Sequence, residues 1–282
     1  ERGRLPWVAT AVALLTRVAA EGSVFTPPYA PSTQALTEYF TSVKDGPGIH
    51  KWVEYFDVYA RHLHRFRGGN VTIVEIGIWS GGSLRMWRHF FGPHARIYGV
   101  DISNRTRAYE QDPTYGSPER IFVGDQGSHE FWDSFKAAVP SVDILIDDGG
   151  HVPEQQRVTL AAMFPAISPG GVYLTEDLHG AAHSFVQTVF NEHVYGNGGL
   201  NNIARHAHRH GGHVTYGQAW IAAVTFHSFM LVIEKRWRPV QERNYRTAVR
   251  HGSLWQPPEF WDESKMAAEV VARRIGYKEG IG

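Results

Sequence analysis

The sequence contains no cysteine, carries no formal net charge and has no long apolar run. Without cysteine the chain cannot form a disulfide, a thiolate zinc site or a cysteine nucleophile, which fits a reducing compartment. Its 28 basic and 28 acidic residues cancel, so no charge excess favours nucleic acid or an anionic membrane as a partner. We therefore expect a cytoplasmic protein that binds neither nucleic acid nor a membrane.

The most apolar stretch near the N-terminus, Leu5–Thr16, is followed by Arg17 and is too short to span a bilayer. Two interpretations stay open for it. It is either the remnant of a processed targeting segment or an amphipathic helix that packs on the domain or on a partner.

The 282 residues are 43% hydrophobic and 13% aromatic, enough to bury a substantial core. From residue 70 onward, short apolar runs alternate with helical stretches, which predicts a parallel sheet covered on both faces. The expected strands are residues 71–76, 96–101, 120–125, 142–147 and 170–177. Two more apolar runs flank His227 and Ser228 and predict a β-hairpin. The expected fold is α/β: a doubly wound, seven-stranded, mostly parallel sheet closed by an antiparallel hairpin.

This pattern divides the chain into three parts. Residues 1–69 predict an N-terminal helical segment, because residues 49–66 place apolar side chains at helical spacing. Residues 70–236 form the α/β domain. Residues 237–282 are a C-terminal extension, which we expect to wrap the domain or a neighbouring subunit.

A glycine-rich turn, "VEIGIWSGGSLRMW", follows the first expected strand and opens a helix near Ser83. Such a turn brings backbone amides and the helix dipole close to a ligand. Gly77 is followed by Gly81 and Gly82, so the spacing is a poor match to the dinucleotide fingerprint G-x-G-x-x-G.

Acidic residues accompany the first three expected strands: Glu75, Asp101 and Asp125. Asp101 ends the second strand, where a carboxylate can accept both hydroxyls of a ribose. Three carboxylates suit a nucleoside that carries a positive charge, whereas they would repel a pyrophosphate. The alternative is that they cap helices and face solvent.

The pattern E-x-G-x-x-x-G-G-S, followed by Asp101 and "GDQ", resembles that of class I S-adenosylmethionine-dependent methyltransferases over roughly residues 45–235. The resemblance implies S-adenosylmethionine as cofactor, with Gly77 and Gly81 under its methionine part and Asp101 on its ribose. The expected cofactor-binding residues are Glu75, Gly77, Ser80, Gly81, Ser83, Asp101, Asp125, Gln126 and Asp147.

The stretch "VDILIDDGGH" ends the fourth strand, and "TED" ends the fifth. Because the carboxyl ends of neighbouring parallel strands meet at one crevice, Asp148, Glu176 and Asp177 are expected to converge. Carboxylates that close repel one another, and an oxygen-only set favours Mg2+, Ca2+ or Mn2+ over zinc. The sequence therefore predicts a divalent metal site.

His151 follows Asp148 after two glycines, which allow a sharp turn. Histidine has the pKa of a base that works near neutral pH. We expect His151 to take a proton from an acceptor hydroxyl bound beside the metal, with Asp148 also serving catalysis. The alternative is that these residues cap helices and a turn.

The motifs "DDGGH" and "TED" resemble those of a narrower group, the metal-dependent sugar O-methyltransferases of macrolide and related antibiotic biosynthesis (the mycinamicin 2''-O-methyltransferase type). The resemblance implies Mg2+ on Asp148, Glu176 and Asp177, His151 as base, a glycoside or saccharide as acceptor, and a homo-oligomer. After its acidic pair the group continues toward Thr-Ser-Tyr, but this chain continues as "LHGAAHSF". The identity of the sugar therefore stays open.

Three alternatives to this function remain. The acceptor is instead a catechol or another vicinal diol, the protein binds a ligand without turnover, or the same fold supports a hydroxylase-like reaction. A histidine-rich segment with His206, His208, His210 and His213 is interpreted as a solvated loop, a transition-metal site or a lid over the crevice.

Overall fold

The structure is a computed structural model that describes residues 26–195 and 215–239. The apolar stretch Leu5–Thr16, the histidine-rich segment and residues 240–282 lie outside these ranges. None of the helices within them is both long enough and apolar enough to cross a membrane.

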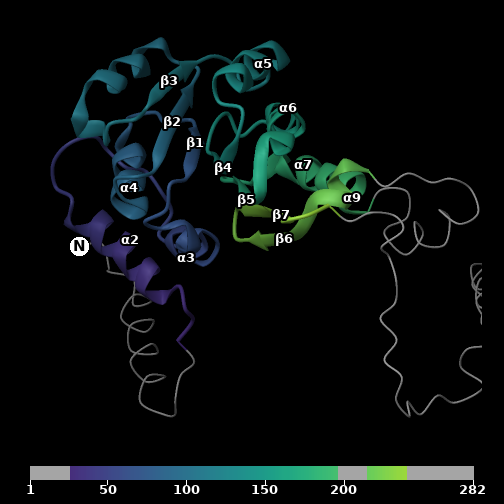
Figure 1. Ribbon diagram of the computed structural model, residues 1–282, viewed down its shortest axis with the longest axis horizontal. Coiled ribbons are helices and arrows are strands. Elements are labelled where there is room, and N and C mark those ends of the chain that lie inside the picture. The colour runs from purple at the N-terminus through teal and green to yellow at the C-terminus, as the bar shows by residue number, and fades with distance from the viewer. Residues whose placement is uncertain (1–25, 196–214, 240–282) are drawn as a thin grey trace, which may run out of the picture. The chain divides into compact units, whose positions relative to one another are not determined.

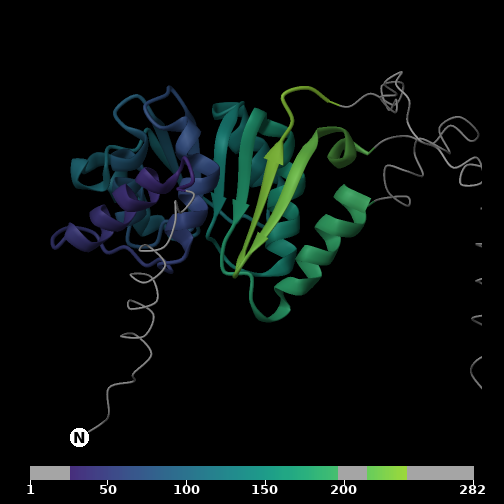
Figure 2. The same cartoon turned by 90° about the horizontal axis from the view of Figure 1, so that it is seen from below.

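One sheet of seven strands organises the described residues (Figure 1). Its strands are β1 (Thr72–Ile76), β2 (Arg96–Asp101), β3 (Arg120–Val123), β4 (Val142–Asp147), β5 (Ile167–Thr175), β6 (Ile221–His227) and β7 (Met230–Lys235). They lie in the order β3-β2-β1-β4-β5-β7-β6. Strands β1 to β5 pair in parallel, while β7 is antiparallel to both β5 and β6. Figure 2 shows the β6–β7 hairpin at one end of the sheet. The predicted fold is confirmed.

Helices cover both faces of the sheet. They are α2 (Ala30–Ser42), α3 (Tyr55–Leu63), α4 (Gly82–Phe91), α5 (His129–Ala138), α6 (Pro153–Met163), α7 (His183–Thr188), the π-helix η6 (Val189–Tyr195) and α9 (Tyr216–Trp220). Short 3-10 turns are η1 (His64–Phe66), η2 (Asn104–Gln111), η3 (Pro113–Tyr115), η4 (Phe164–Ala166) and η5 (Gly180–Ala182).

Successive side chains of the central strands point to opposite faces of the sheet and pack into two different hydrophobic cores. Ile73 and Ile144 pack with the apolar side chains of α2, α3 and α4. Their neighbours Val74 and Leu145 pack with those of α5, α6 and α7. Burial on both faces explains why the apolar runs of these strands are continuous rather than alternating.

The structure departs from the expected elements in two places that matter for the site. Residues 49–54 were expected to be helical, but α3 begins only at Tyr55. Gly46, Pro47 and Gly48 come just before this segment and disfavour helix. At the end of the fifth strand, β5 stops at Thr175 and Asp177 has a φ of 53°. This left-handed conformation turns the chain out of the sheet.

Candidate functional site

A cavity of about 470 Å3 opens where the parallel strands end. Residues from both predicted sites line it: Gly77, Asp101, Asp125, Gln126, Asp148, His151 and Asp177, together with Trp79 and Ile102. Four predicted cofactor residues therefore border the same space as the predicted base and two of the three predicted metal ligands.

The glycine turn supports the floor of this cavity. Gly77 has a φ of 79°, and a Cβ placed on it would collide with the backbone carbonyl of Asp148. The "DDGGH" loop can therefore pack directly on the turn only because residue 77 is glycine. Gly81, the N-cap of α4, also has a φ of 79°, and a Cβ there would lie 2.5 Å from Tyr115.

Two acidic residues line the far end of the cavity. Asp101 is 9% exposed and accepts hydrogen bonds from the backbone N–H groups of Trp79 (3.0 Å) and Ser103 (2.8 Å). Asp125 accepts one from the N–H of Gly127 at 2.8 Å. These bonds orient the carboxylates, and each oxygen retains capacity to accept a further bond from a ligand.

Two other predicted cofactor residues, Glu75 and Asp147, are buried and do not line this cavity. Glu75 is fully buried, and its Oε2 accepts a hydrogen bond from Ser83 at 2.6 Å. Asp147 is buried and accepts one from Gln126 Nε2 at 2.9 Å, and burial raises the pKa of Asp147 to about 6. Gln126 Oε1 accepts from the N–H of Gly150 at 2.7 Å. This network holds the "DDGGH" loop in place.

Ser80 contacts the N-terminal segment rather than the main cavity. Its hydroxyl donates to the carbonyl of Gly48 at 2.8 Å. Ser80 thereby ties the glycine turn to the chain that leads into α3.

Asp148, His151 and Asp177 form the group in the described residues that could hold a metal ion. Each offers one ligand atom, and these atoms all lie within 4.8 Å of one another. His151 Nε2 is 3.9 Å from Asp148 Oδ1 and 3.8 Å from Asp177 Oδ2. Of the three predicted metal ligands, the structure thus brings two together beside the predicted base.

Each of these two carboxylates has its second oxygen bound by the protein. Asp148 Oδ2 accepts from Lys51 Nζ at 2.7 Å. Asp177 Oδ1 accepts from the Tyr55 hydroxyl at 2.7 Å and from Trp52 Nε1 at 3.2 Å. One oxygen of each carboxylate is therefore anchored while the other faces His151.

Glu176, the third predicted metal ligand, faces a lysine that the sequence analysis did not identify. Lys51 Nζ lies 3.0 Å from Glu176, 2.7 Å from Asp148 and 3.2 Å from Glu75, and its side chain is 2% exposed. Glu176 also accepts from the Tyr59 hydroxyl at 2.6 Å. In this arrangement Glu176 lies outside the group formed by Asp148, His151 and Asp177.

The charges of this cluster depend on one another. Burial alone would lower the pKa of Lys51, but the surrounding carboxylates, Glu176 foremost, outweigh it and the pKa lies well above its ordinary value. Burial raises the pKa of Glu176, whereas Lys51 acts to lower it. The sequence held one signal for such a lysine. Glu75, Asp148 and Glu176 were expected near neighbouring strand ends, and carboxylates buried together require a cation.

Backbone strain is concentrated around this cavity. Among the described residues, the non-glycine positions with positive φ are Trp79, Ser117, His151, Asp177 and Phe229. Three of them, Trp79, His151 and Asp177, line the cavity. Strained backbone of this kind persists where the surroundings enforce it and gathers at ligand sites.

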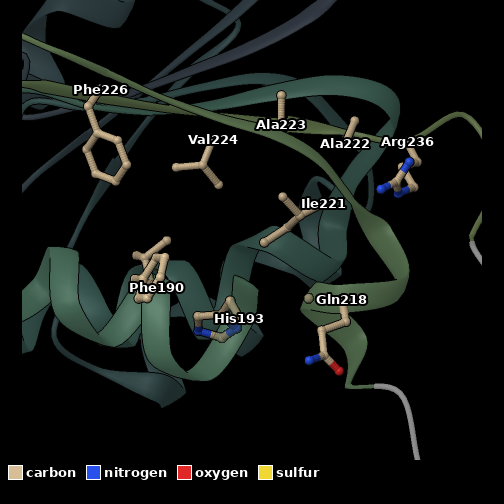
Figure 3. Close-up of a pocket in the computed structure, with 11 residues that line it drawn as sticks. Phe190, His193, Gln218, Ile221, Ala222, Ala223, Val224, Phe226 and Arg236 are labelled. Atoms are coloured by element: carbon tan, nitrogen blue, oxygen red, sulfur yellow. The ribbon is translucent and has the colours of Figure 1, made fainter. Parts of the chain in front are cut away.

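A second cavity, of about 300 Å3, lies between β6 and the π-helix η6 (Figure 3). Apolar side chains such as Phe190, Ile221 and Val224 line it, together with His193 and Arg236. None of the predicted site residues borders this cavity, so the chemistry predicted from the sequence belongs to the first one.

Comparison with known proteins points to one family. Residues 74–178 match the family described as "Methyltransferase domain". Demethylmacrocin O-methyltransferase from Streptomyces fradiae is 38% identical over 155 residues, which cover 52% of this chain and 36% of that protein. Mycinamicin VI 2''-O-methyltransferase from Micromonospora griseorubida is 36% identical over 155 residues, with the same coverage. A rhamnosyl tetracenomycin-C 2'-O-methyltransferase from Streptomyces olivaceus is 36% identical over 138 residues, 46% of this chain and 34% of that protein.

Solved structures show the same likeness. The MycE methyltransferase of the mycinamycin pathway, in complex with Mg, SAH and mycinamycin VI, is 27% identical with a TM-score of 0.52. The alignment covers 85% of this chain and 59% of that structure. In the sequence alignments above, by contrast, this chain covers only about a third of the length of the curated relatives.

Proposed function

Since residues 74–178 match the family described as "Methyltransferase domain", we propose that this chain is an S-adenosylmethionine- and Mg2+-dependent O-methyltransferase. The acceptor is a sugar hydroxyl of a glycosylated natural product or a saccharide. The observation that carries this proposal is that Asp101 and His151 line the same cavity. A cofactor held at Asp101 and an acceptor beside His151 would meet there.

The cofactor end of the cavity is acidic, which suits a sulfonium. Asp101 and Asp125 end neighbouring strands, where their carboxylates can accept hydrogen bonds from ribose hydroxyls and a base amine. The exposed side chains of Trp79 (70%) and Ile102 (72%) offer apolar surface to the adenine.

The residues at the other end fit a hard divalent cation. Asp148 and Asp177 each direct one oxygen toward the same point, and carboxylate oxygens are the preferred ligands of Mg2+. Glu176 can join this set if it exchanges its contact with Lys51 for the metal. When bound, Mg2+ would lower the pKa of a coordinated hydroxyl.

His151 would move the proton. Its Nε2 lies beside both carboxylates and takes the proton of the acceptor hydroxyl. The acceptor oxygen then bonds to the methyl carbon while the carbon–sulfur bond breaks, leaving S-adenosylhomocysteine. The His151 side chain is 31% exposed, so it can pass the proton on to solvent.

The relatives support a sugar acceptor. One is named for methylation of a rhamnosyl tetracenomycin and another for the 2'' position of mycinamicin VI. The structure of MycE contains Mg, SAH and mycinamycin VI together.

Calorimetric titration with S-adenosylmethionine and S-adenosylhomocysteine, with Mg2+ and then with EDTA, tests the proposal. We expect both to bind, followed by Mg2+-dependent methyl transfer to glycosides and not to catechols. As an internal check, Asp101→Asn should weaken cofactor binding and leave Mg2+ affinity unchanged. Failure of both cofactor forms to bind would refute the methyltransferase assignment.

A further inference from the structure

Two aromatic side chains, Trp52 and Phe229, present exposed faces beside Asp177. Trp52 is 52% exposed and Phe229 is 47% exposed. Their ring centroids lie 6.0 Å apart with an interplanar angle of 32°. We call this pair the aromatic platform. Other exposed aromatic side chains occur in the chain, but these two rings lie together beside a predicted metal ligand, which makes them a candidate contact surface for another molecule.

Hydrogen bonds tie the platform to the predicted metal group. Trp52 Nε1 donates to Asp177 Oδ1 at 3.2 Å. The carbonyl of Phe229 accepts from the N–H of Leu178, the residue after Asp177, at 2.8 Å. A molecule lying on the platform would therefore have its edge within reach of Asp177.

The backbone of Phe229 is held in an unfavourable conformation. Ser228 and Phe229 form the two-residue turn between β6 and β7, and Phe229 has a φ of 62°. A turn residue with positive φ is usually glycine or asparagine, because a larger side chain is strained there. Half of the Phe229 side chain is exposed, so burial in the core does not explain why an aromatic residue stands there. Strain kept at such a position suggests a ligand contact.

We propose that the aromatic platform binds the apolar C–H face of the acceptor's pyranose ring and directs two neighbouring hydroxyls toward Asp148 and Asp177. This inference rests on the proposed function and names the part of the acceptor that the chain recognises. A pyranose has one face of C–H bonds and a rim of hydroxyls. The platform supplies flat apolar surface next to the Asp177 carboxylate, which matches both features.

The first test measures binding without turnover. Methyl α-rhamnopyranoside is titrated in the presence of S-adenosylhomocysteine and Mg2+, with tryptophan fluorescence and saturation-transfer NMR as readouts. We expect the signal from the C–H protons of one sugar face to dominate. Binding of catechol in preference to the rhamnoside would overturn the proposal.

The second test uses variants of the platform. Phe229→Asn should relieve the backbone strain and leave the melting temperature unchanged or higher. It should also weaken rhamnoside binding and raise the acceptor KM roughly fivefold to tenfold, as expected when about one aromatic contact is lost. Trp52→Phe keeps a ring and should retain more affinity than Trp52→Leu. Phe226→Ala, which removes an aromatic side chain of 54% exposure from β6, is the matched control. It should change neither the rhamnoside affinity nor the acceptor KM.

These measurements separate the two claims. Methyl transfer by every variant with an unchanged acceptor KM would refute the platform and leave the methyltransferase proposal standing. Rhamnoside binding that weakens in Phe229→Asn, in a protein that transfers no methyl group, would support the platform and refute the proposed reaction.

Discussion

Asp148 and Asp177 each divide their two oxygens between the protein and the cavity. Lys51 holds one oxygen of Asp148, and Tyr55 with Trp52 holds one of Asp177. The remaining oxygens lie 3.9 Å (Asp148) and 3.8 Å (Asp177) from His151 Nε2. Because both carboxylates are already oriented, a cation can bind without first paying to order them.

His151 can serve either as the base or as a ligand, and one variant distinguishes the two roles. His151→Ala should lower kcat about 100-fold or more if the residue is the base, with little change in cofactor and Mg2+ affinity. Initial rates together with calorimetry check this. A fall in Mg2+ affinity as large as the fall in kcat would assign His151 to the metal instead.

Lys51 is the cation of a buried cluster that contains three carboxylates. Lys51→Met should destabilise the protein by about 3–5 kcal/mol, because the carboxylates lose their partner in a poorly solvated environment. Urea unfolding measures this loss, and added Mg2+ should recover part of it. Lys44→Met, on an exposed lysine of the same segment, is the control. Equal stability of the two variants would contradict the role given to Lys51.

At the scale of elements, the glycine turn and the "DDGGH" loop form one packed unit. Gly77→Ala should push the loop away, because its Cβ meets the Asp148 carbonyl. We expect a loss of cofactor and Mg2+ affinity together with a lower melting temperature. Gly68→Ala is the matched control, since Gly68 has a φ of 75° but no atom within 4 Å of the added Cβ. Gly68→Ala should lower the free energy of unfolding by about 1–2 kcal/mol, the cost of a left-handed backbone conformation in a residue other than glycine. Its ligand binding should be normal.

The sequence predicted those strands well whose apolar pattern reflects their burial in the middle of the sheet. Continuous apolar runs marked β1, β2 and β4 because both sides of each strand are buried. Asp101, which ends β2, and Asp148, which directly follows β4, could be assigned to one crevice from topology alone.

Lys51 escaped prediction because its partners are distant in the chain. It lies 97 residues from Asp148 and 125 from Glu176, and the segment around it has apolar spacing that favours helix. The same spacing led to the wrong prediction that the helix begins at residue 49, whereas α3 begins at Tyr55. Which oxygen of each carboxylate faces the cavity likewise depends on contacts between separate elements.

At the scale of the whole molecule, α3 and the turn η1 that follows it are linked to β7 by polar side chains. Glu234 on β7 lies 2.9 Å from His62 Nδ1 and 3.7 Å from Arg65. The hydrogen bond with His62, helped by Arg65, holds the pKa of Glu234 below its ordinary value. The folded state therefore binds this proton less tightly than the unfolded chain does.

The sign of this shift gives a pH dependence. Stability from Glu234 is fully present above pH 4.5, the ordinary value, and is lost as the pH falls through the lowered pKa. Glu234→Gln should lower the free energy of unfolding, measured with urea, by about 1 kcal/mol at pH 7. The loss should be smaller at pH 3, where the Glu234 carboxylate is partly protonated. Glu154→Gln, in an exposed pair with Arg157, should show a much smaller loss at pH 7. An equal cost of Glu234→Gln at both pH values would contradict the assignment.

The position of Lys51 bears on how segments of this chain can be recombined with those of other proteins. The segment that matches the family, residues 74–178, contains Glu75, Asp148 and Glu176 but not the Lys51 ammonium that contacts all three. If that segment were moved alone into another protein, it would carry a buried excess of negative charge into its new host. The N-terminal segment and the sheet thus form one electrostatic unit, and a recombinant that joins them from different parents must match charge as well as shape.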